Sequence, residues 1–456
     1  MSIFSNAESG LKIPPQAAKA LSILQQKGFE ACLAGGCVRD MLMGLTPKDW
    51  DIATAANPQQ VKAAFHGYRV FETGIKHGTV TVLVDHEPLE ITTFREDVGY
   101  SDHRHPDAVV FTGSLREDVA RRDFTMNALA FDPERGVIDY FGGAEDINGQ
   151  IIRCVGEANH RFNEDALRIL RALRFSSVLG FSIEEKTAAS IRSNKELLRA
   201  VSVERITVEL TKLICGRKAS DVLQEFADVI AVVIPEILPM IDFQQHNEHH
   251  CFDVWRHTTE VVKNSEVTHV LRWAALFHDI GKPDCFSLGE DGVGHFYGHN
   301  ARSKEKADAI MERLKFDHAT RDRVLMLVTH HDTPIPPEKK LIKRYLNRFG
   351  EETLRQLLSL QRADTMGQAP KYRFRVQEIE NTLAVMEQVI AEAACFSLKD
   401  LAVDGNDMIS LGLKGREIGA ALDFLLNAVM DERTPNEKSL LLKYFNQNHT
   451  RATGDK

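Results

Sequence analysis

The stretch that decides the fold reads Ala34-Gly35-Gly36-Cys37-Val38-Arg39-Asp40 and continues shortly afterwards with Asp49-Trp50-Asp51. An apolar run ends at Ala34, and the residues from Val38 to Leu45 have helical spacing. This order predicts a strand, a glycine turn, a helix and a second strand. Because successive side chains of a strand point to opposite faces, Asp49 and Asp51 are expected to point the same way.

The chemistry of these residues suits phosphates and divalent cations. Two carboxylates on one face repel each other unless a hard cation lies between them. The Gly35-Gly36 turn lets the backbone approach a phosphate closely, and Arg39 can bind its oxygens. The combination is typical of nucleotidyl transfer, in which two Mg²⁺ ions hold a triphosphate and activate a hydroxyl. Either motif alone is more often an ordinary turn or a solvated surface.

Length and composition indicate a soluble protein of two to four domains, with 456 residues, 43% hydrophobic and 27% charged. No apolar run is long enough to cross a bilayer. The start of the chain lacks the pattern of a signal peptide. Seven scattered cysteines without a CxxC pair favour reduced thiols in the cytoplasm. The net charge of −9 weakly disfavours nucleic-acid binding, which nevertheless needs only a local basic surface.

Short strands and helices alternate up to about residue 150, and the pattern is helical from Phe162 onward. A histidine-rich stretch at 246–257 is interpreted as a domain boundary. The expected elements before residue 150 are a helix over Gln16–Lys27, strands over Phe29–Ala34 and Asp49–Thr54, and a hairpin of Val80–Val84 with Leu89–Phe94.

The run Arg121-Arg122-Asp123-Phe124-Thr125-Met126-Asn127 carries side chains suited to a nucleotide. Arg122 can bind triphosphate oxygens, and Asn127 can hydrogen-bond a ribose or a phosphate. The alternative is a basic pair at the surface beside a buried Phe124.

A second charged run extends from Glu164 to Phe175. If the whole run is helical, an i,i+3 row is formed by Asp165, Arg168, Arg171 and Arg174. Asp165 can accept a hydrogen bond from an exocyclic amine, and Arg168 can donate to ring acceptors. Such a pair could read the edge of a base. The alternative is an amphipathic helix with ion pairs at the surface.

These motifs resemble those of class II tRNA nucleotidyltransferases, the family of CCA-adding enzymes and poly(A) polymerases. The match is carried, in order and spacing, by Gly35-Gly36-x-Val38-Arg39-Asp40, Asp49-x-Asp51, Arg121-Arg122-Asp123-Phe124-Thr125-x-Asn127 and Glu164-Asp165-x-x-Arg168. The resemblance implies a polymerase-β-like head in which Asp49 and Asp51 are catalytic and bind Mg²⁺. It also implies nucleotide-binding roles for Gly36, Arg39, Arg122, Asp165, Arg168, Arg171 and Arg174. Asp165 and Arg168 would serve as the protein template for CTP and ATP, and Glu90 is a candidate third carboxylate.

The run Leu276-Phe277-His278-Asp279-Ile280-Gly281-Lys282 resembles the HD phosphohydrolase superfamily. The resemblance implies a second divalent metal held by His257, His278, Asp279 and Asp364, with His299 and His330 as further ligands or phosphate contacts. Imidazoles and carboxylates suit Mn²⁺, Ni²⁺ or Fe²⁺. The expected reaction is hydrolysis of a phosphomonoester or a 2′,3′-cyclic phosphate, and the alternative is a retained helical fold with an idle site.

The expected fold is α+β, with a polymerase-β-like nucleotidyltransferase head, an all-α body, an HD-type helical domain and a helical tail. The expected domains are the head at 1–150, a helical body with the nucleotide-selection helix and RNA binding at 151–243, the HD domain at 244–370 and the tail at 371–456. A polar stretch from Arg95 to Phe111 is interpreted as a loop that moves when specificity switches from C to A.

The sequence thus predicts a cytoplasmic, Mg²⁺-dependent enzyme that builds or repairs the 3′-CCA end of tRNA from CTP and ATP without a nucleic-acid template. The alternatives are a poly(A) polymerase and an HD phosphohydrolase with an RNA-binding head. A silent RNA-binding protein is disfavoured because both sets of site residues are complete. In the tail, Lys438, Lys443 and Arg451 are expected at the tRNA backbone or as solvated charges. No membrane partner is expected, and the oligomeric state is left open.

Overall fold

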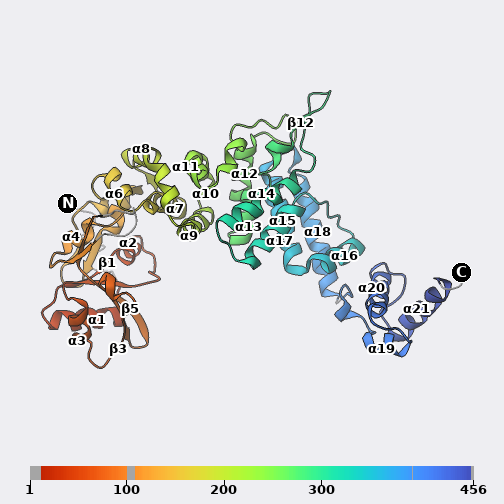
Figure 1. The fold of residues 1–456 in the computed structure, drawn as a ribbon, viewed down its shortest axis with the longest axis horizontal. Helices are drawn as coiled ribbons and strands as arrows, with labels where there is room; N and C mark the ends of the chain where they lie inside the picture. Colours follow the sequence, from red (N-terminus) through yellow and green to blue (C-terminus); the bar gives the residue numbers. More distant parts are fainter. Residues whose placement is uncertain (1–11, 100–107, 393, 453–456) are drawn as a thin grey trace. The chain divides into compact units, whose positions relative to one another are not determined.

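The structure is a computed structural model that describes residues 12–99, 108–392 and 394–452 (Figure 1). The chain divides into two compact units, Met1–Leu238 and Pro239–Lys456. The first contains a mixed sheet followed by helices, and the second is built mainly of helices, which confirms the expected α+β fold. The finer division into four domains stays a prediction. Within the described ranges, no helix is both long enough and apolar enough to span a membrane.

The central sheet of the first unit has seven strands, and the site depends on its register. Their order is β3 (Arg69–Phe71), β4 (Thr79–Val84), β5 (Glu87–Thr93), β2 (Asp51–Thr54), β1 (Ala31–Ala34), β8 (Leu129–Asp132) and β9 (Gly136–Asp139). β2 and β5 are parallel, and the other neighbouring pairs are antiparallel. The parallel register places Asp51 opposite Glu90.

The predicted hairpin and the first predicted helix are both present. The hairpin of β4 and β5 closes through Asp85 and His86, which both have positive φ, as the twist of a tight hairpin favours. Helix α1 (Pro15–Gln26) buries one apolar stripe, formed by Ala17, Ala20, Leu21 and Leu24. The remaining elements up to residue 149 are α2 (Gly36–Leu42), α3 (Pro58–Ala64), α4 (Leu115–Ala120), α5 (Gly143–Gly149) and the hairpin of β6 (Arg95–Val98) and β7 (Ala108–Phe111). Residues 100–107 of the predicted moving loop lie outside the described ranges.

The first unit continues as a set of helices in which α7 is central. They are α6 (Ala158–Glu164), α7 (Leu167–Leu179), α8 (Glu185–Asn194), α9 (Val203–Ile214), α10 (Ala219–Glu225) and α11 (Ala227–Val233). The apolar face of α7 includes Ile169, Leu170 and Leu173, which are fully buried. This packing fixes the direction in which the arginines on the opposite side of α7 point.

The second unit forms two groups of helices. The first group comprises α12 (Val254–Asn264), α13 (His269–Phe277), α14 (His299–Arg313), α15 (His318–His330), α16 (Lys339–Phe349), α17 (Glu351–Gly367) and α18 (Arg375–Ala391). The tail follows with α19 (Gly405–Ser410), α20 (Arg416–Met430) and α21 (Lys438–Ala452), which share a core that includes Met408, Leu425 and Leu441. Lys438 forms an ion pair with Asp407 of the tail. The side chain of Arg451 lies outside the described part of the chain.

Candidate functional site

The glycine turn after β1 brings the backbone close to an arginine. Gly35 has φ +86°, and a Cβ atom there would lie 2.2 Å from Nη1 of Arg122. Its N–H donates to the carbonyl of Leu129 on β8. An L side chain at this position would therefore be strained and would displace the guanidinium. The turn lets α2 begin at Gly36 directly beside Arg122.

The predicted carboxylates lie at the start of β2. The strand begins at Asp51, so the prediction that Asp49 belongs to it is wrong; Asp49 lies in an exposed bend just before the strand. Burial raises the pKa of Asp51, and the neighbouring carboxylates of Glu90 and Asp49 raise it further against the opposing effect of Arg122. All three carboxylates line a cavity of about 750 Å³, the carboxylate cavity. A set of oxygen donors that repel one another fits a hard divalent cation.

A second cavity, of about 460 Å³, gathers the predicted nucleotide-binding residues and is here named the arginine cavity. Its walls include Gly36, Arg39, Arg122, Asp165, Arg168, Arg171 and Arg174. Asp51 lines this cavity as well as the carboxylate cavity. The carboxylate at the start of β2 therefore lies where the two cavities meet, with arginines on one side and carboxylates on the other.

A hydrogen-bonded chain holds the arginines in place. Arg39 donates to Asn127 at 2.7 Å, and Asn127 donates to Asp123 at 2.9 Å. The same carboxylate forms an ion pair of 2.6 Å with Arg171 on α7. Burial would raise the pKa of Asp123, but Arg171 and Asn127 outweigh burial and hold the pKa at about 2. Asp123 is therefore an anion that joins α2, the segment after α4, and α7.

An aromatic ring completes this wall. The guanidinium carbon of Arg174 lies 3.9 Å from the centroid of the Phe175 ring, and those of Arg39 and Arg171 lie 5.2 and 5.5 Å away. Cations over an aromatic face are attracted by its quadrupole. The ring thus helps to hold three like charges together in a small volume.

Asp165 and Arg168 do not form the helical pair that the sequence predicts. Asp165 has extended backbone angles (φ −139°, ψ 103°) between α6 and α7, so only the three arginines share the row on α7. Arg168 forms an ion pair with Glu164 and donates to the carbonyl of Arg121 at 2.9 Å. The Asp165 carboxylate accepts from Arg205 at 2.7 Å and from the N–H of Leu167 at 3.1 Å.

The sequence motifs do not predict a role for Arg205. It lies on α9, lines the arginine cavity and has a buried Nη1 atom without a hydrogen-bond partner. One turn further along α9, Glu209 forms an ion pair of 2.7 Å with Arg174. Arg205 and Glu209, spaced i,i+4 on α9, thus pair with Asp165 and Arg174, respectively. That charge pattern is the signal that could have identified α9 as part of the site.

Comparison with known proteins identifies the family. Residues 31–153 match the family described as "Poly A polymerase head domain", and residues 297–445 match a family of tRNA nucleotidyltransferase domain 2. A CCA-adding enzyme from Lactobacillus helveticus is 35% identical over 438 residues, which cover 95% of this chain and 98% of that protein. This chain belongs to the CCA-adding enzyme family. A CCA-adding enzyme from Levilactobacillus brevis is 34% identical over 92% of this chain and 95% of its own length.

A solved structure supports the same assignment over the full fold. The crystal structure of the Bacillus stearothermophilus CCA-adding enzyme in complex with CTP is 30% identical and has a TM-score of 0.71. The match covers 97% of this chain and 100% of that chain. The polymerase-type head and the helical body are thus features that this chain shares with a solved CCA-adding enzyme.

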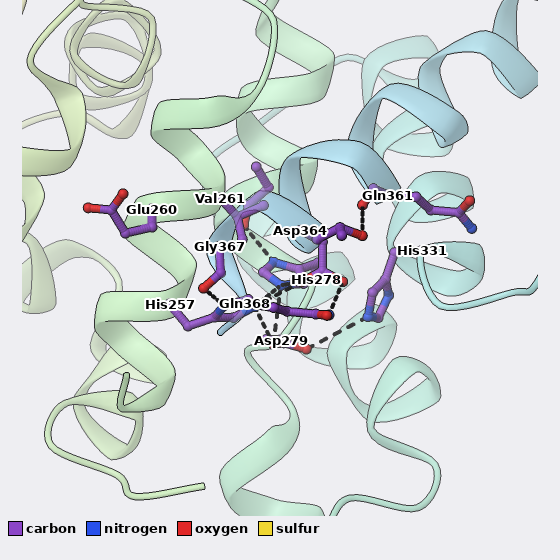
Figure 2. Close-up of polar contacts among 12 residues, drawn as sticks. His257, Glu260, Val261, His278, Asp279, His331, Gln361, Asp364, Gly367 and Gln368 are labelled. Carbon is purple, nitrogen blue, oxygen red and sulfur yellow. Dashed lines mark hydrogen bonds and ion pairs between the residues drawn. The ribbon is translucent and has the colours of Figure 1, made fainter. Parts of the chain in front are cut away.

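The second unit of this family member contains a separate cluster of imidazoles and carboxylates, shown in part in Figure 2. We name it the histidine–aspartate cluster; its members are His257, His278, Asp279, His299, His331 and Asp364. His257 lies 2.9 Å from Asp364, and His278 lies 3.2 Å from Asp279, measured from each Nε2 to a carboxylate oxygen. Two groups of possible metal ligands share Asp279: one with His257 and His278, the other with His299 and His331. His330, expected beside His299, instead packs against Phe349 outside the cluster.

The orientation of the four imidazoles fits a bound cation. Each Nδ1 lies 2.8–3.2 Å from a backbone carbonyl, which leaves Nε2 as the atom that faces the cluster. A hydrogen bond at one ring nitrogen that frees the other for a metal is the usual arrangement of metal-binding histidines. Facing Nε2 atoms are only 3.3 Å apart for His257 and His278, and 3.2 Å for His299 and His331. Lone pairs that converge at such distances repel unless a positive charge lies among them.

Nearby charges favour the protonated form of one imidazole of the cluster, His278, whereas burial lowers the pKa of His331 to about 4. Burial lowers the pKa of His278, but Asp279 and Asp364 outweigh burial and raise it. Lys282 reaches the Asp279 carboxylate at 2.6 Å and is itself buried. Buried carboxylates require such partners, because an uncompensated buried charge is strongly destabilising.

Proposed function

We propose that this chain adds the terminal CCA of tRNA from CTP and ATP, and that the arginine cavity holds the incoming nucleotide. The observation that carries this proposal is the position of Asp51 at the meeting point of the arginine cavity and the carboxylate cavity. Cations on one side can hold a triphosphate, while carboxylates on the other can hold the ions that transfer needs. The family of CCA-adding enzymes supplies the substrate class.

The phosphate end of the nucleotide is assigned to Gly36, Arg39 and Arg122. The open backbone of the glycine turn lets phosphate oxygens approach, and the two guanidinium groups donate to them. Asn127 orients Arg39 through its side-chain carbonyl and is placed to meet the ribose. These residues thus hold the triphosphate with its α-phosphorus toward Asp51.

Asp49 and Asp51 are assigned as the catalytic carboxylates and as ligands of Mg²⁺, with Glu90 as a third candidate. When bound, the ions lower the pKa of the attacking hydroxyl and balance the charge of the leaving pyrophosphate. The tRNA 3′-hydroxyl forms the new bond to the α-phosphorus, and the bond to pyrophosphate breaks. We place this enzyme in the cytoplasm, where tRNA, CTP and ATP are present together.

Base selection is assigned to Asp165 with Arg168 and, from the geometry, Arg205. Cytosine and adenine both present an exocyclic amine next to a ring nitrogen that accepts hydrogen bonds. A fixed carboxylate beside a guanidinium matches both bases, whereas uracil and guanine offer different donors and acceptors. Arg171 and Arg174 complete the cationic wall. A protein template of this kind needs no nucleic-acid template.

We predict that Asp51→Asn reduces incorporation of CMP into a tRNA lacking CCA by about a thousandfold or more, because the ion clamp contributes roughly 4 kcal/mol to the transition state. Gel assays with radiolabelled tRNA measure this rate. Asp85→Asn, an exposed carboxylate in the β4–β5 turn, is the control and should extend tRNA normally. Normal extension by Asp51→Asn would mean that Asp51 of the head does not take part in nucleotide transfer. It would favour the histidine–aspartate cluster as the main active site.

We predict that Arg205→Ala raises KM for CTP about tenfold and weakens the rejection of UTP, because Asp165 loses a charged hydrogen bond worth roughly 1.5 kcal/mol. The Mg²⁺ concentration that gives half-maximal rate should not change. Arg199→Ala, which removes an exposed arginine paired with Glu196, is the matched control. Equal effects of the two variants would contradict the role of Arg205.

We propose a second function for the histidine–aspartate cluster: metal-dependent hydrolysis of a phosphate ester. The convergence of four Nε2 atoms on the carboxylate of Asp279, with Asp364 beside two of them, favours this function, since such a donor set suits Mn²⁺, Ni²⁺ or Fe²⁺. The imidazoles and carboxylates of the cluster would hold the metal, which would supply Lewis-acid chemistry for hydrolysis of the ester. Lys282 neutralises Asp279 and holds it in place. Removal of a damaged phosphate end would complement the repair of tRNA ends.

We predict that the Asp49→Ala/Asp51→Ala protein, reconstituted with Mn²⁺ and passed through a desalting column, retains about two ions per chain at the cluster. His331→Ala should lower this to about one, and Asp279→Ala to none, because Asp279 belongs to both ligand groups. Mass spectrometry of the metal content measures the ratio. His330→Ala is the matched control and should retain two; a loss equal to that of His331→Ala would refute the assignment.

A further inference from the structure

A cavity of about 560 Å³ opens beside the histidine–aspartate cluster, where His331 and Asp364 form part of its wall. We name it the side cavity. The rest of the wall comes from residues 332–337, from the end of α17 and from the start of α18. Cavities of this size are typical of small-molecule sites. Any ligand in the side cavity would lie directly next to a group bound at the cluster.

Gln368 provides an unsatisfied polar atom in this cavity. Its side-chain N–H donates to the second carboxylate oxygen of Asp364 at 3.3 Å, and Figure 2 shows the two residues together at the cluster. The residue is only 7% exposed, yet its Oε1 has no hydrogen-bond partner. A buried carbonyl without a donor is destabilising, so a hydroxyl of a ligand would complete it.

The remaining wall is suited to an uncharged group. Ile335 and Ile379 contribute apolar surface. Arg375 supplies the positive charge of the wall, and the carboxylates of Asp332 and Glu378 oppose it. A second phosphate in the side cavity would therefore meet more negative than positive charge.

We propose that the side cavity holds the alcohol part of a phosphate ester and that Gln368 determines specificity by accepting a hydrogen bond from a hydroxyl next to the ester. This inference rests on the hydrolase function proposed for the cluster. The substrate class is an ester with a single phosphate on a neutral, hydroxyl-bearing group of nucleoside size. In the reaction, the oxygen of water bonds to phosphorus, and the ester oxygen leaves with a proton as a second hydroxyl. Because the wall carries more negative than positive charge, it also disfavours the additional phosphates of CTP and ATP. The cluster is therefore expected not to hydrolyse these substrates of the head.

The test compares adenosine 3′-monophosphate with its 2′-deoxy counterpart on the full-length, Mn²⁺-loaded protein, with release of inorganic phosphate as the readout. The ribonucleotide should be preferred by about tenfold in kcat/KM, since the deoxy compound leaves Oε1 unpaired. Gln368→Met should reduce the preference to about twofold, mainly through KM. Gln388→Met, an exposed glutamine on α18, should keep the wild-type preference. An unchanged preference in Gln368→Met would overturn the role of Gln368.

Amide hydrogen exchange of the metal-free, full-length protein gives a readout that does not depend on hydrolysis. Adenosine 3′-monophosphate should slow exchange over 331–337 and 375–382, and less so in Gln368→Met. Slowed exchange without phosphate release from the loaded protein would refute the hydrolase but support the side cavity as a binding site. Phosphate release without slowed exchange or ribose preference would refute the inference and leave the hydrolase standing. If neither is observed, both proposals are wrong.

Discussion

The arginine cavity depends on the ion pairs and hydrogen bonds made by the buried carboxylate of Asp123. Several guanidinium groups crowd into a small volume there and would repel one another without a fixed anion. Asp123 binds Arg171 directly and Arg39 through Asn127, so α2 and α7 are held on either side of one negative charge. Its depressed pKa keeps that charge at all pH values near neutrality. The arrangement of the arginines around this cavity therefore does not require a bound nucleotide.

Much of this architecture could be predicted from the sequence, because the motifs are local. The glycine turn, Asp51, Arg122 and the arginines of α7 follow from short spacings within one or two elements. The sequence wrongly predicts Asp165 on the same helix as the arginines, because i,i+3 spacing does not reveal the break between α6 and α7. Arg205 was missed because its partner Asp165 lies forty residues earlier, and only tertiary packing of α7 on α9 brings them together. His331 and not its neighbour His330 faces the cluster, a choice set by the helical phase at the end of α15.

The two sites of this CCA-adding enzyme family member use different donor chemistry. The head presents carboxylate oxygens, which suit hard ions that exchange with each nucleotide. The histidine–aspartate cluster presents nitrogen-rich donors, most of them buried, which suit a metal that stays bound. Under the two functions proposed here, the different donor sets would keep addition to the tRNA end and removal of a phosphate from competing for the same ion.

CCA addition is tested by extension of a tRNA transcript that lacks CCA, resolved to single nucleotides, with CTP alone, ATP alone and both together. We expect CTP alone to add two residues, and both nucleotides together to add C, C and one A, after which extension stops. A long ladder of A residues with ATP alone, indifferent to CTP, would contradict it and identify a poly(A) polymerase.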